Sequence, residues 1–166
     1  MAYMPMNISD QAVLEKCRDV EFLCRDIYSY FADLYDGNDG AVRLWRKTSM
    51  EEQNHADQFT LALKLNKGLA CMVTVKPDTL ELILTQIRAV LEKIKATPPT
   101  LLDALYSSIK MEKYLSDFHL GCVVEFEDSS YKKLFQAMMA SDQEHIASLQ
   151  AAYDKLKDTH DRILKG

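Results

Sequence analysis

Glycine and proline are scarce in this chain of 166 residues, which contains 5 Gly and 4 Pro. These two residues interrupt helices and mark turns, and most of them lie here between segments of helical periodicity. So few interruptions predict a small number of long helices.

Basic residues are not in excess either, because the formal net charge is -5. The chain therefore lacks the basic surface that nucleic-acid binding requires. No run of 18 apolar residues and no basic start followed by an apolar stretch occurs, so we expect neither a membrane span nor a leader. A content of 48% hydrophobic and 27% charged residues predicts one soluble, cytoplasmic domain over residues 1–166.

Paired cysteines are also missing. The four cysteines, at positions 17, 24, 71 and 122, form no C-x-x-C motif, which argues against a thiol-redox site or a four-cysteine metal site. Cys17 and Cys24 would lie roughly 10 Å apart along one helix, too far to bridge each other. We interpret the cysteines as small buried hydrophobic residues.

Helical periodicity predicts an all-α fold, a four-helix bundle with one additional helix. The expected helices cover about residues 9–35, 41–66, 78–95, 100–126 and 130–164. The 78–95 helix, with Asp78 and Glu81 placed as a capping box, belongs to the long connection between the second and third bundle helices. At roughly 27 Å it can cross most of the bundle, which makes those two helices parallel.

A possible metal site begins with Glu52 and His55, which lie three residues apart and leave the same face of a helix. Alone this spacing is weak evidence for a metal site, but Asp142 and His145 repeat it on the last helix. Glu21 and Glu112 lie in apolar surroundings on the first and third bundle helices. A two-metal site in a bundle core uses one carboxylate from each of two helices and a carboxylate-x-x-His pair from each of the others.

The positions of the turns show whether these groups lie at the same height along the bundle. In a helical hairpin, two side chains at equal height are equally far in sequence from the turn, so their midpoint falls in the turn. The midpoint of Glu21 and Glu52 falls between residues 36 and 37, at the edge of the Gly-rich segment 36–40. The midpoint of Glu112 and Asp142 falls at residue 127, in a second polar turn. All six groups are therefore predicted near one level.

Two divalent ions would balance four buried carboxylates, which would otherwise repel each other. Oxygen-rich ligation with two imidazoles suits iron or manganese, and zinc can occupy such a site. We expect Glu52 and Glu112 to bridge two iron ions, with Glu21 and Asp142 as terminal ligands.

Several neighbouring residues remain open to two interpretations. Tyr28 and His119 each follow a ligand by seven residues, and either could hydrogen-bond that ligand or be a polar side chain at a helix interface. Glutamates 51, 125 and 144 are interpreted as solvent-facing. Residues interpreted as packing are Trp45, Tyr106, Tyr114, Met138 and Met139.

The predicted ligands resemble, in order and spacing, those of the rubrerythrin branch of the ferritin-like superfamily. They are Glu21, Glu52, His55, Glu112, Asp142 and His145. The resemblance implies a homodimeric non-haem di-iron oxidoreductase that reduces hydrogen peroxide in oxidative-stress defence. The C-x-x-C pairs of a rubredoxin module are absent, so the electron donor would be a separate protein such as a rubredoxin.

The chain departs from that pattern at two positions, with Asp142 where rubrerythrins have Glu and Ile109 where they have a further Glu. Bacterioferritin has similar ligands, but Gln53 stands where its haem-binding methionine would be. The alternatives are reduction of dioxygen, an iron-handling or ferroxidase protein, and a helical interaction protein without metal.

Overall fold

Five α-helices account for nearly all of the chain that the computed structural model describes, residues 8–65, 76–121 and 129–165. The helices are α1 (Ile8–Leu34), α2 (Asp39–Leu65), α3 (Pro77–Ala96), α4 (Leu101–Gly121) and α5 (Ser129–Lys165). Within these ranges no strand occurs, so the predicted all-α fold is confirmed. The predicted end of the fourth helix, 122–126, and the cysteines at positions 71 and 122 lie outside the described residues.

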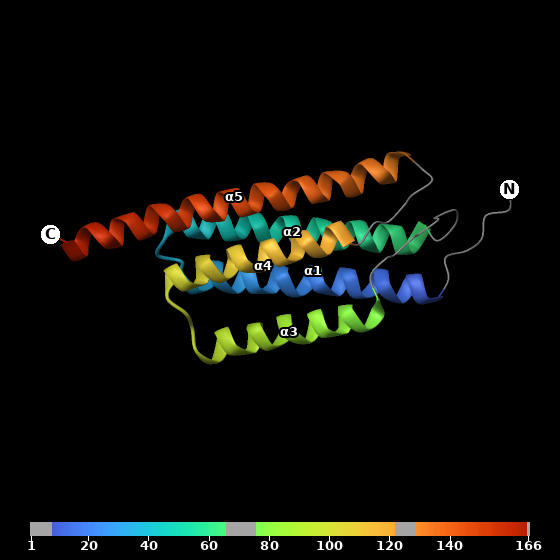
Figure 1. Cartoon of the computed structure of the whole chain (residues 1–166), viewed down its shortest axis with the longest axis horizontal. Helices are drawn as coiled ribbons and strands as arrows, with labels where there is room; N and C mark the ends of the chain where they lie inside the picture. Colours follow the sequence, from blue (N-terminus) through green and yellow to red (C-terminus); the bar gives the residue numbers. More distant parts are fainter. Residues whose placement is uncertain (1–7, 66–75, 122–128, 166) are drawn as a thin grey trace.

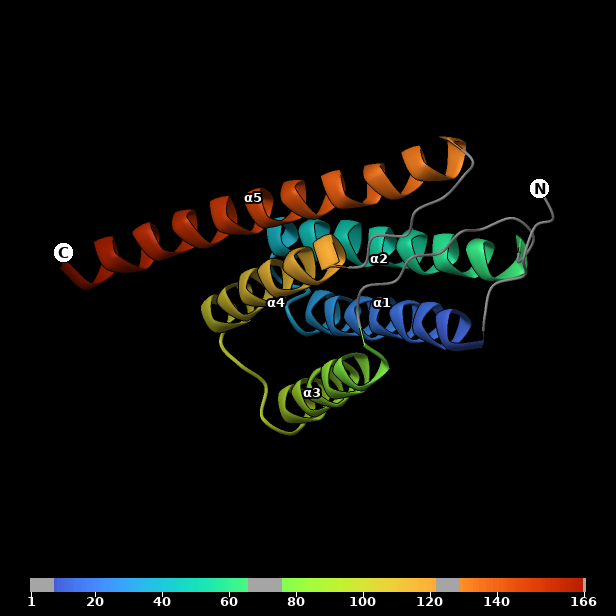
Figure 2. The same cartoon turned by 45° about the vertical axis from the view of Figure 1, so that its right-hand side comes forward.

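The helices form two antiparallel hairpins and one crossing helix (Figure 1). In one hairpin α1 pairs with α2, and in the other α4 pairs with α5. The connecting helix α3 runs back along the outside of α1, so α2 and α4 point the same way, as predicted (Figures 1 and 2). The C-terminal ends of α1 and α4 consequently lie at opposite ends of the bundle.

Local hydrogen bonds explain where two of the helices begin. Asn38 Oδ1 accepts from the backbone N–H of Ala41 at 3.0 Å, which caps α2 after a connection over residues 35–38. At the start of α4, Thr100 Oγ1 accepts from the backbone N–H of Asp103 at 3.2 Å and donates to its carboxylate at 2.7 Å. Both connections are therefore closed by side chains of the turn itself.

The start of α3 differs from the prediction. The helix begins at Pro77, and the residue before it, Lys76, makes no side-chain capping hydrogen bond. Proline fits the first helical position because its fixed φ suits the helix and its missing N–H would have had no helical partner there. Asp78 lies inside the first turn, so the predicted capping box was wrong, and the carboxylate of Glu81 instead pairs with Lys16 of α1.

The hydrophobic core lies along the inner faces of the helices. On α1 an apolar stripe that recurs at three- and four-residue steps is buried, at Val13, Cys17, Val20, Cys24, Ile27 and Phe31. The helix α3 buries Leu80, Ile83, Leu84, Ile87, Leu91 and Ile94, and it packs on α1. The first helix is thus covered by α2 on one side and by α3 on another.

Trp45 connects the two hairpins at one end of the bundle. Its side chain is fully buried, its ring lies 5.1 Å from Phe31, and its Nε1–H donates to Ser108 Oγ of α4 at 3.1 Å. The packing role predicted for Trp45 is confirmed. Tyr106 is half-exposed, and its ring packs on that of Tyr153 of α5 at 5.9 Å.

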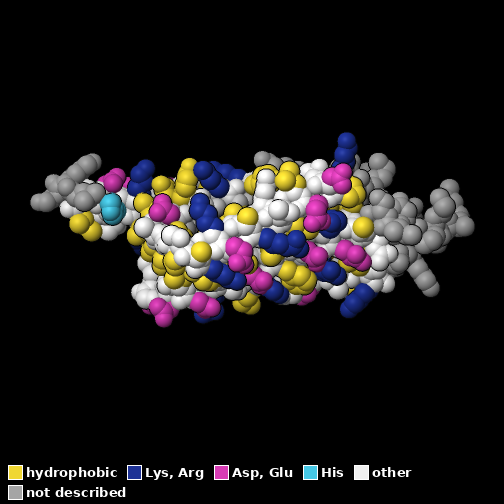
Figure 3. Space-filling view, turned by 90° about the horizontal axis from the view of Figure 1, so that it is seen from below, with side chains coloured by type: hydrophobic (Ala, Val, Ile, Leu, Met, Phe, Trp, Pro, Cys, Tyr) yellow, Lys and Arg dark blue, Asp and Glu magenta, His cyan; other side chains and the backbone are white. Residues whose placement is uncertain are grey.

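The surface viewed from the α3 side carries charges of both signs among scattered apolar side chains (Figure 3). Neither sign forms a continuous patch on this face. Among the helices of the described ranges, none combines the length and apolar character needed to cross a bilayer.

Candidate metal centre

Five titratable side chains meet inside the bundle. Glu21 comes from α1, Glu52 and His55 from α2, Glu112 from α4 and His145 from α5. Each is at most 2% exposed. Carboxylates are almost never fully buried without a partner, so this density of buried titratable groups marks a candidate functional site.

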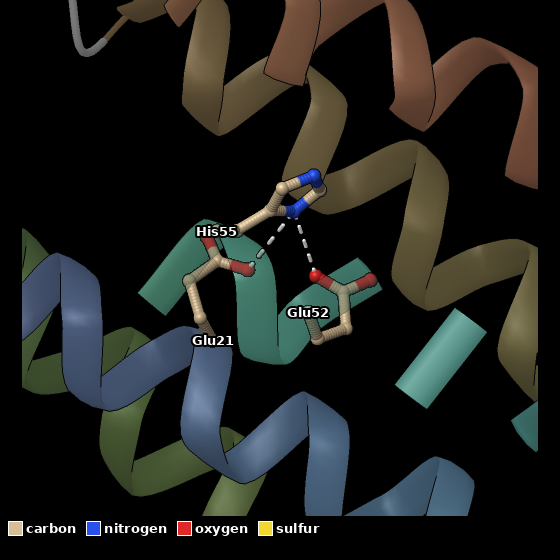
Figure 4. Close-up of side chains that lie close together, drawn as sticks. All are labelled: Glu21, Glu52 and His55. Carbon is tan, nitrogen blue, oxygen red and sulfur yellow. Dashed lines mark hydrogen bonds and ion pairs between the residues drawn. The ribbon is translucent and has the colours of Figure 1, made fainter. Parts of the chain in front are cut away.

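The first group consists of Glu21, Glu52 and His55, whose carboxylates point at one edge of the imidazole ring (Figure 4). His55 Nδ1 lies 3.0 Å from Glu52 Oε2 and 3.7 Å from Glu21 Oε2. The spacing of Glu52 and His55 on α2 directs both side chains to the same place, and the hairpin brings Glu21 level with them.

The second group consists of Glu52, Glu112 and His145, so Glu52 belongs to both groups. His145 Nδ1 lies 3.5 Å from Glu112 Oε2 and 3.7 Å from Glu52 Oε1. The rings of His55 and His145 are stacked with their centroids 6.2 Å apart. Two similar groups therefore lie side by side and share one carboxylate between them.

Protons are held tightly by this cluster. Burial raises the pKa of Glu52 well above its usual range, and the neighbouring Glu112 carboxylate raises it further. Burial opposes the charged form of His55, but Glu21 and Glu52 outweigh it and raise its pKa to about 10. The pKa of His145 is raised in the same way, mainly by Glu112. Protons thus serve as counter-ions that a cation could displace.

The donor atoms of each group lie close together. In each group one oxygen or nitrogen from each residue lies within 4.8 Å of the others. Glu52 Oε1 and His145 Nδ1 make no hydrogen bond to any described residue, although both are buried. Two donors bound to one ion at about 2.1 Å lie roughly 3 to 4 Å apart, which is the spacing seen here. Each group could therefore hold a metal ion.

Tyr28 lies beside the cluster, and its hydroxyl donates to Glu112 Oε1. Burial raises the pKa of this tyrosine well above its ordinary value, and the Glu112 and Glu52 carboxylates add to the effect. The phenol consequently stays protonated and can act as a hydrogen-bond donor. Of the two interpretations of Tyr28 from sequence, the structure favours a hydrogen bond to Glu112, one of the predicted ligands.

Glu51 was predicted to face solvent, and this prediction was wrong. Its side chain is 24% exposed, and its Oε2 accepts from His145 Nε2 across the interface between α2 and α5. Lys47, one turn earlier on α2, lies 3.7 Å from the other carboxylate oxygen. The sequence signal for this contact is its place directly before Glu52, on the flank of α2 that faces α5 rather than α1.

The structure thus brings together Glu21, Glu52, His55, Glu112 and His145 of the six predicted ligands. Asp142 lies on α5, but its side chain, like that of His119 on α4, is outside the described residues. Glu144, predicted to face solvent, is exposed on α5, and Glu125 lies outside the described residues. Comparisons with protein families, with curated proteins and with solved structures found no match.

Proposed function

We propose that this chain is a non-haem di-iron oxidoreductase that reduces hydrogen peroxide or dioxygen. The single observation that carries the proposal is Glu52, a buried carboxylate shared by two adjacent Glu, Glu and His groups drawn from four helices. Two ions bridged by one carboxylate need this arrangement, whereas a single structural ion would need only one group.

Iron is the metal that we assign to the centre. Carboxylate oxygens with one imidazole for each ion suit iron or manganese, and zinc could bind the same donors without redox chemistry. The described groups contain no thiolate, which soft metals prefer. We propose Asp142, the sixth ligand predicted from the sequence, as the remaining terminal ligand.

Each ligand has a role in this proposal. Glu52 would hold both ions, Glu21 and His55 would hold one of them, and Glu112 and His145 would hold the other. Two ferrous ions would supply two electrons, which with two protons convert one hydrogen peroxide into two water molecules. The Tyr28 hydroxyl donates to Glu112 and holds its carboxylate in place as the charge of the site changes.

The resemblance to rubrerythrins leads us to propose a ferritin-like homodimer supplied by a separate electron-donor protein. One difference within the site limits this likeness. Ile109, one turn before Glu112, is buried and apolar, so it provides no additional carboxylate for exchange between ligands. Turnover here would use a fixed ligand set.

Peroxide consumption tests the proposal. Protein loaded anaerobically with ferrous iron is given hydrogen peroxide and an excess of reductant, and peroxide loss is followed over many turnovers. We expect steady consumption that Glu52→Ala abolishes, since both groups lose a ligand. The matched control Glu144→Ala removes an exposed carboxylate and should leave the rate unchanged.

The alternative functions give different results in the same experiment. An iron-storage protein would oxidise a stoichiometric amount of iron and stop, and it would form a cage-sized particle instead of a dimer. Equal peroxide consumption by wild type and Glu52→Ala would rule out the proposed centre as the site of the reaction.

A further inference from the structure

The two ring nitrogens of His145 face different surroundings on opposite sides of the ring. Nδ1 faces the interior, 3.5 Å from Glu112 Oε2 and 3.7 Å from Glu52 Oε1. Nε2 faces the flank of α2, where Glu51 Oε2 accepts from it, and Ser141 Oγ lies 3.3 Å from it. A neutral imidazole carries one proton, so the partner of one nitrogen decides whether the other has a free lone pair.

Glu51 is itself held in position. Its second oxygen lies 3.7 Å from Lys47 Nζ on the same helix, and its side chain is only 24% exposed. Because Glu51 directly precedes Glu52, the two nitrogens of His145 face consecutive residues of α2: Nε2 donates to Glu51, and Nδ1 lies 3.7 Å from Glu52 Oε1. The hydrogen bond to Glu51 therefore holds the ring at Nε2, while Nδ1 makes no hydrogen bond to any described residue and faces the interior.

We propose that Glu51 is a positioning residue for the second ion. By accepting a hydrogen bond from His145 Nε2–H, it selects the tautomer whose Nδ1 lone pair faces Glu52 and Glu112. A carboxylate on the far nitrogen of a metal-binding histidine fixes the ring and increases its basicity as a ligand. The inference rests on the proposed metal centre, since a histidine without a metal would need no selected tautomer.

Cobalt binding tests this role without depending on turnover. Metal-free protein is titrated anaerobically with Co²⁺, and the visible absorption of bound cobalt reports the affinity of each equivalent. For Glu51→Ala we expect the second equivalent to bind about 10- to 100-fold more weakly, with the first little changed. Glu51→Gln should bind it more tightly than Glu51→Ala, because the amide oxygen accepts the same hydrogen bond.

The control variant is Glu144→Ala, which removes the exposed carboxylate next to His145 in sequence and should bind both equivalents as wild type does. Wild-type affinity for both equivalents in Glu51→Ala would overturn the positioning role while leaving the metal centre standing. The positioning role would also be overturned if Glu51→Gln bound the second equivalent no more tightly than Glu51→Ala. If wild type binds no cobalt, iron or zinc, the metal centre fails, and the inference fails with it.

A spectroscopic readout separates positioning from a purely structural ion pair. In protein loaded with Zn²⁺, long-range ¹H–¹⁵N spectra of histidine show which ring nitrogen carries the proton. We expect His145 to be protonated at Nε2 in wild type and in Glu51→Gln. Loss of that single tautomer in Glu51→Ala supports the inference, and its persistence there contradicts it.

Discussion

Glu52 Oε1 and His145 Nδ1 lie 3.7 Å apart inside the bundle, and neither makes a hydrogen bond to another described residue. The separation is too long for a hydrogen bond and suits two ligands of one ion. Leaving a polar atom buried without a hydrogen bond costs about 1–3 kcal/mol. The metal-free protein therefore keeps a local instability that a bound ion would remove.

Ferrous iron should accordingly stabilise the fold. An ion present at 100 times its dissociation constant raises the melting temperature by roughly 5 to 10 °C in a protein of this size. Anaerobic thermal denaturation with and without iron measures the shift, and a chelator should reverse it. Glu52→Gln should show little shift, and an equal shift in that variant would mean that the ion binds elsewhere.

The stability of the metal-free protein should fall as the pH rises. The pKa of His55 is raised from 6.5 to about 10, so its folded form retains a proton that its unfolded form has lost. Its contribution to stability is complete below pH 6.5 and disappears as the pH passes about 10. The raised pKa of Glu52 acts in the same direction. The expected slope is up to about 1.4 kcal/mol per pH unit for one proton.

Urea unfolding in the presence of a chelator, at intervals across this window, measures that slope. His55→Gln should flatten it, whereas His160→Gln at an exposed position of α5 should not. Bound metal should reverse the trend, because binding displaces protons and strengthens as the pH rises. A metal-free protein that becomes more stable toward pH 10 would contradict the assignment.

Tyr28→Phe removes one hydroxyl from the interior, and with it the hydrogen bond that Glu112 accepts. A hydrogen bond to a charged group contributes about 1.5–3 kcal/mol, so we expect the free energy of unfolding to fall by that amount. The matched control is Tyr30→Phe, whose hydroxyl donates to the Ile94 carbonyl at 3.2 Å in a partly buried position. That variant should lose about 0.5–1.5 kcal/mol, and an equal loss in both would argue against a special role for Tyr28.

Ser108→Ala tests the connection between the hairpins. It leaves the buried Nε1–H of Trp45 without its acceptor, which should cost about 1–3 kcal/mol. Ser107→Ala makes the same chemical change at an exposed position of α4 and should change stability by less than about 0.5 kcal/mol. Trp45 is the only tryptophan, so its fluorescence reports unfolding in both variants.

Much of this architecture could be predicted because it depends on helical periodicity and chain length. The apolar stripe of α1 defined its buried face, and the midpoint of Glu21 and Glu52 coincided with the connection over residues 35–38. The length of the α3 segment predicted the parallel course of α2 and α4. These features follow from the regular rise and turn of a helix.

The remaining features depend on contacts that periodicity does not describe. The helical angle of Glu51 placed it off the ligand face, but α2 has two neighbours, and the flank that turns away from α1 faces α5. Proline was interpreted from the sequence only as a residue that interrupts helices, although Pro77 fits the first position of one. Both errors came from treating a helix in isolation from its neighbours or its ends.

The two groups of candidate ligands draw on different parts of the chain. Glu21, Glu52 and His55 all lie on the α1–α2 hairpin, whereas Glu112 and His145 come from the α4–α5 hairpin. The ribosome delivers the chain from its N-terminus, and the early hairpin can pair before the later one has emerged. The first group can therefore form from the early hairpin alone, whereas the second needs Glu112 and His145 from the later hairpin to reach Glu52.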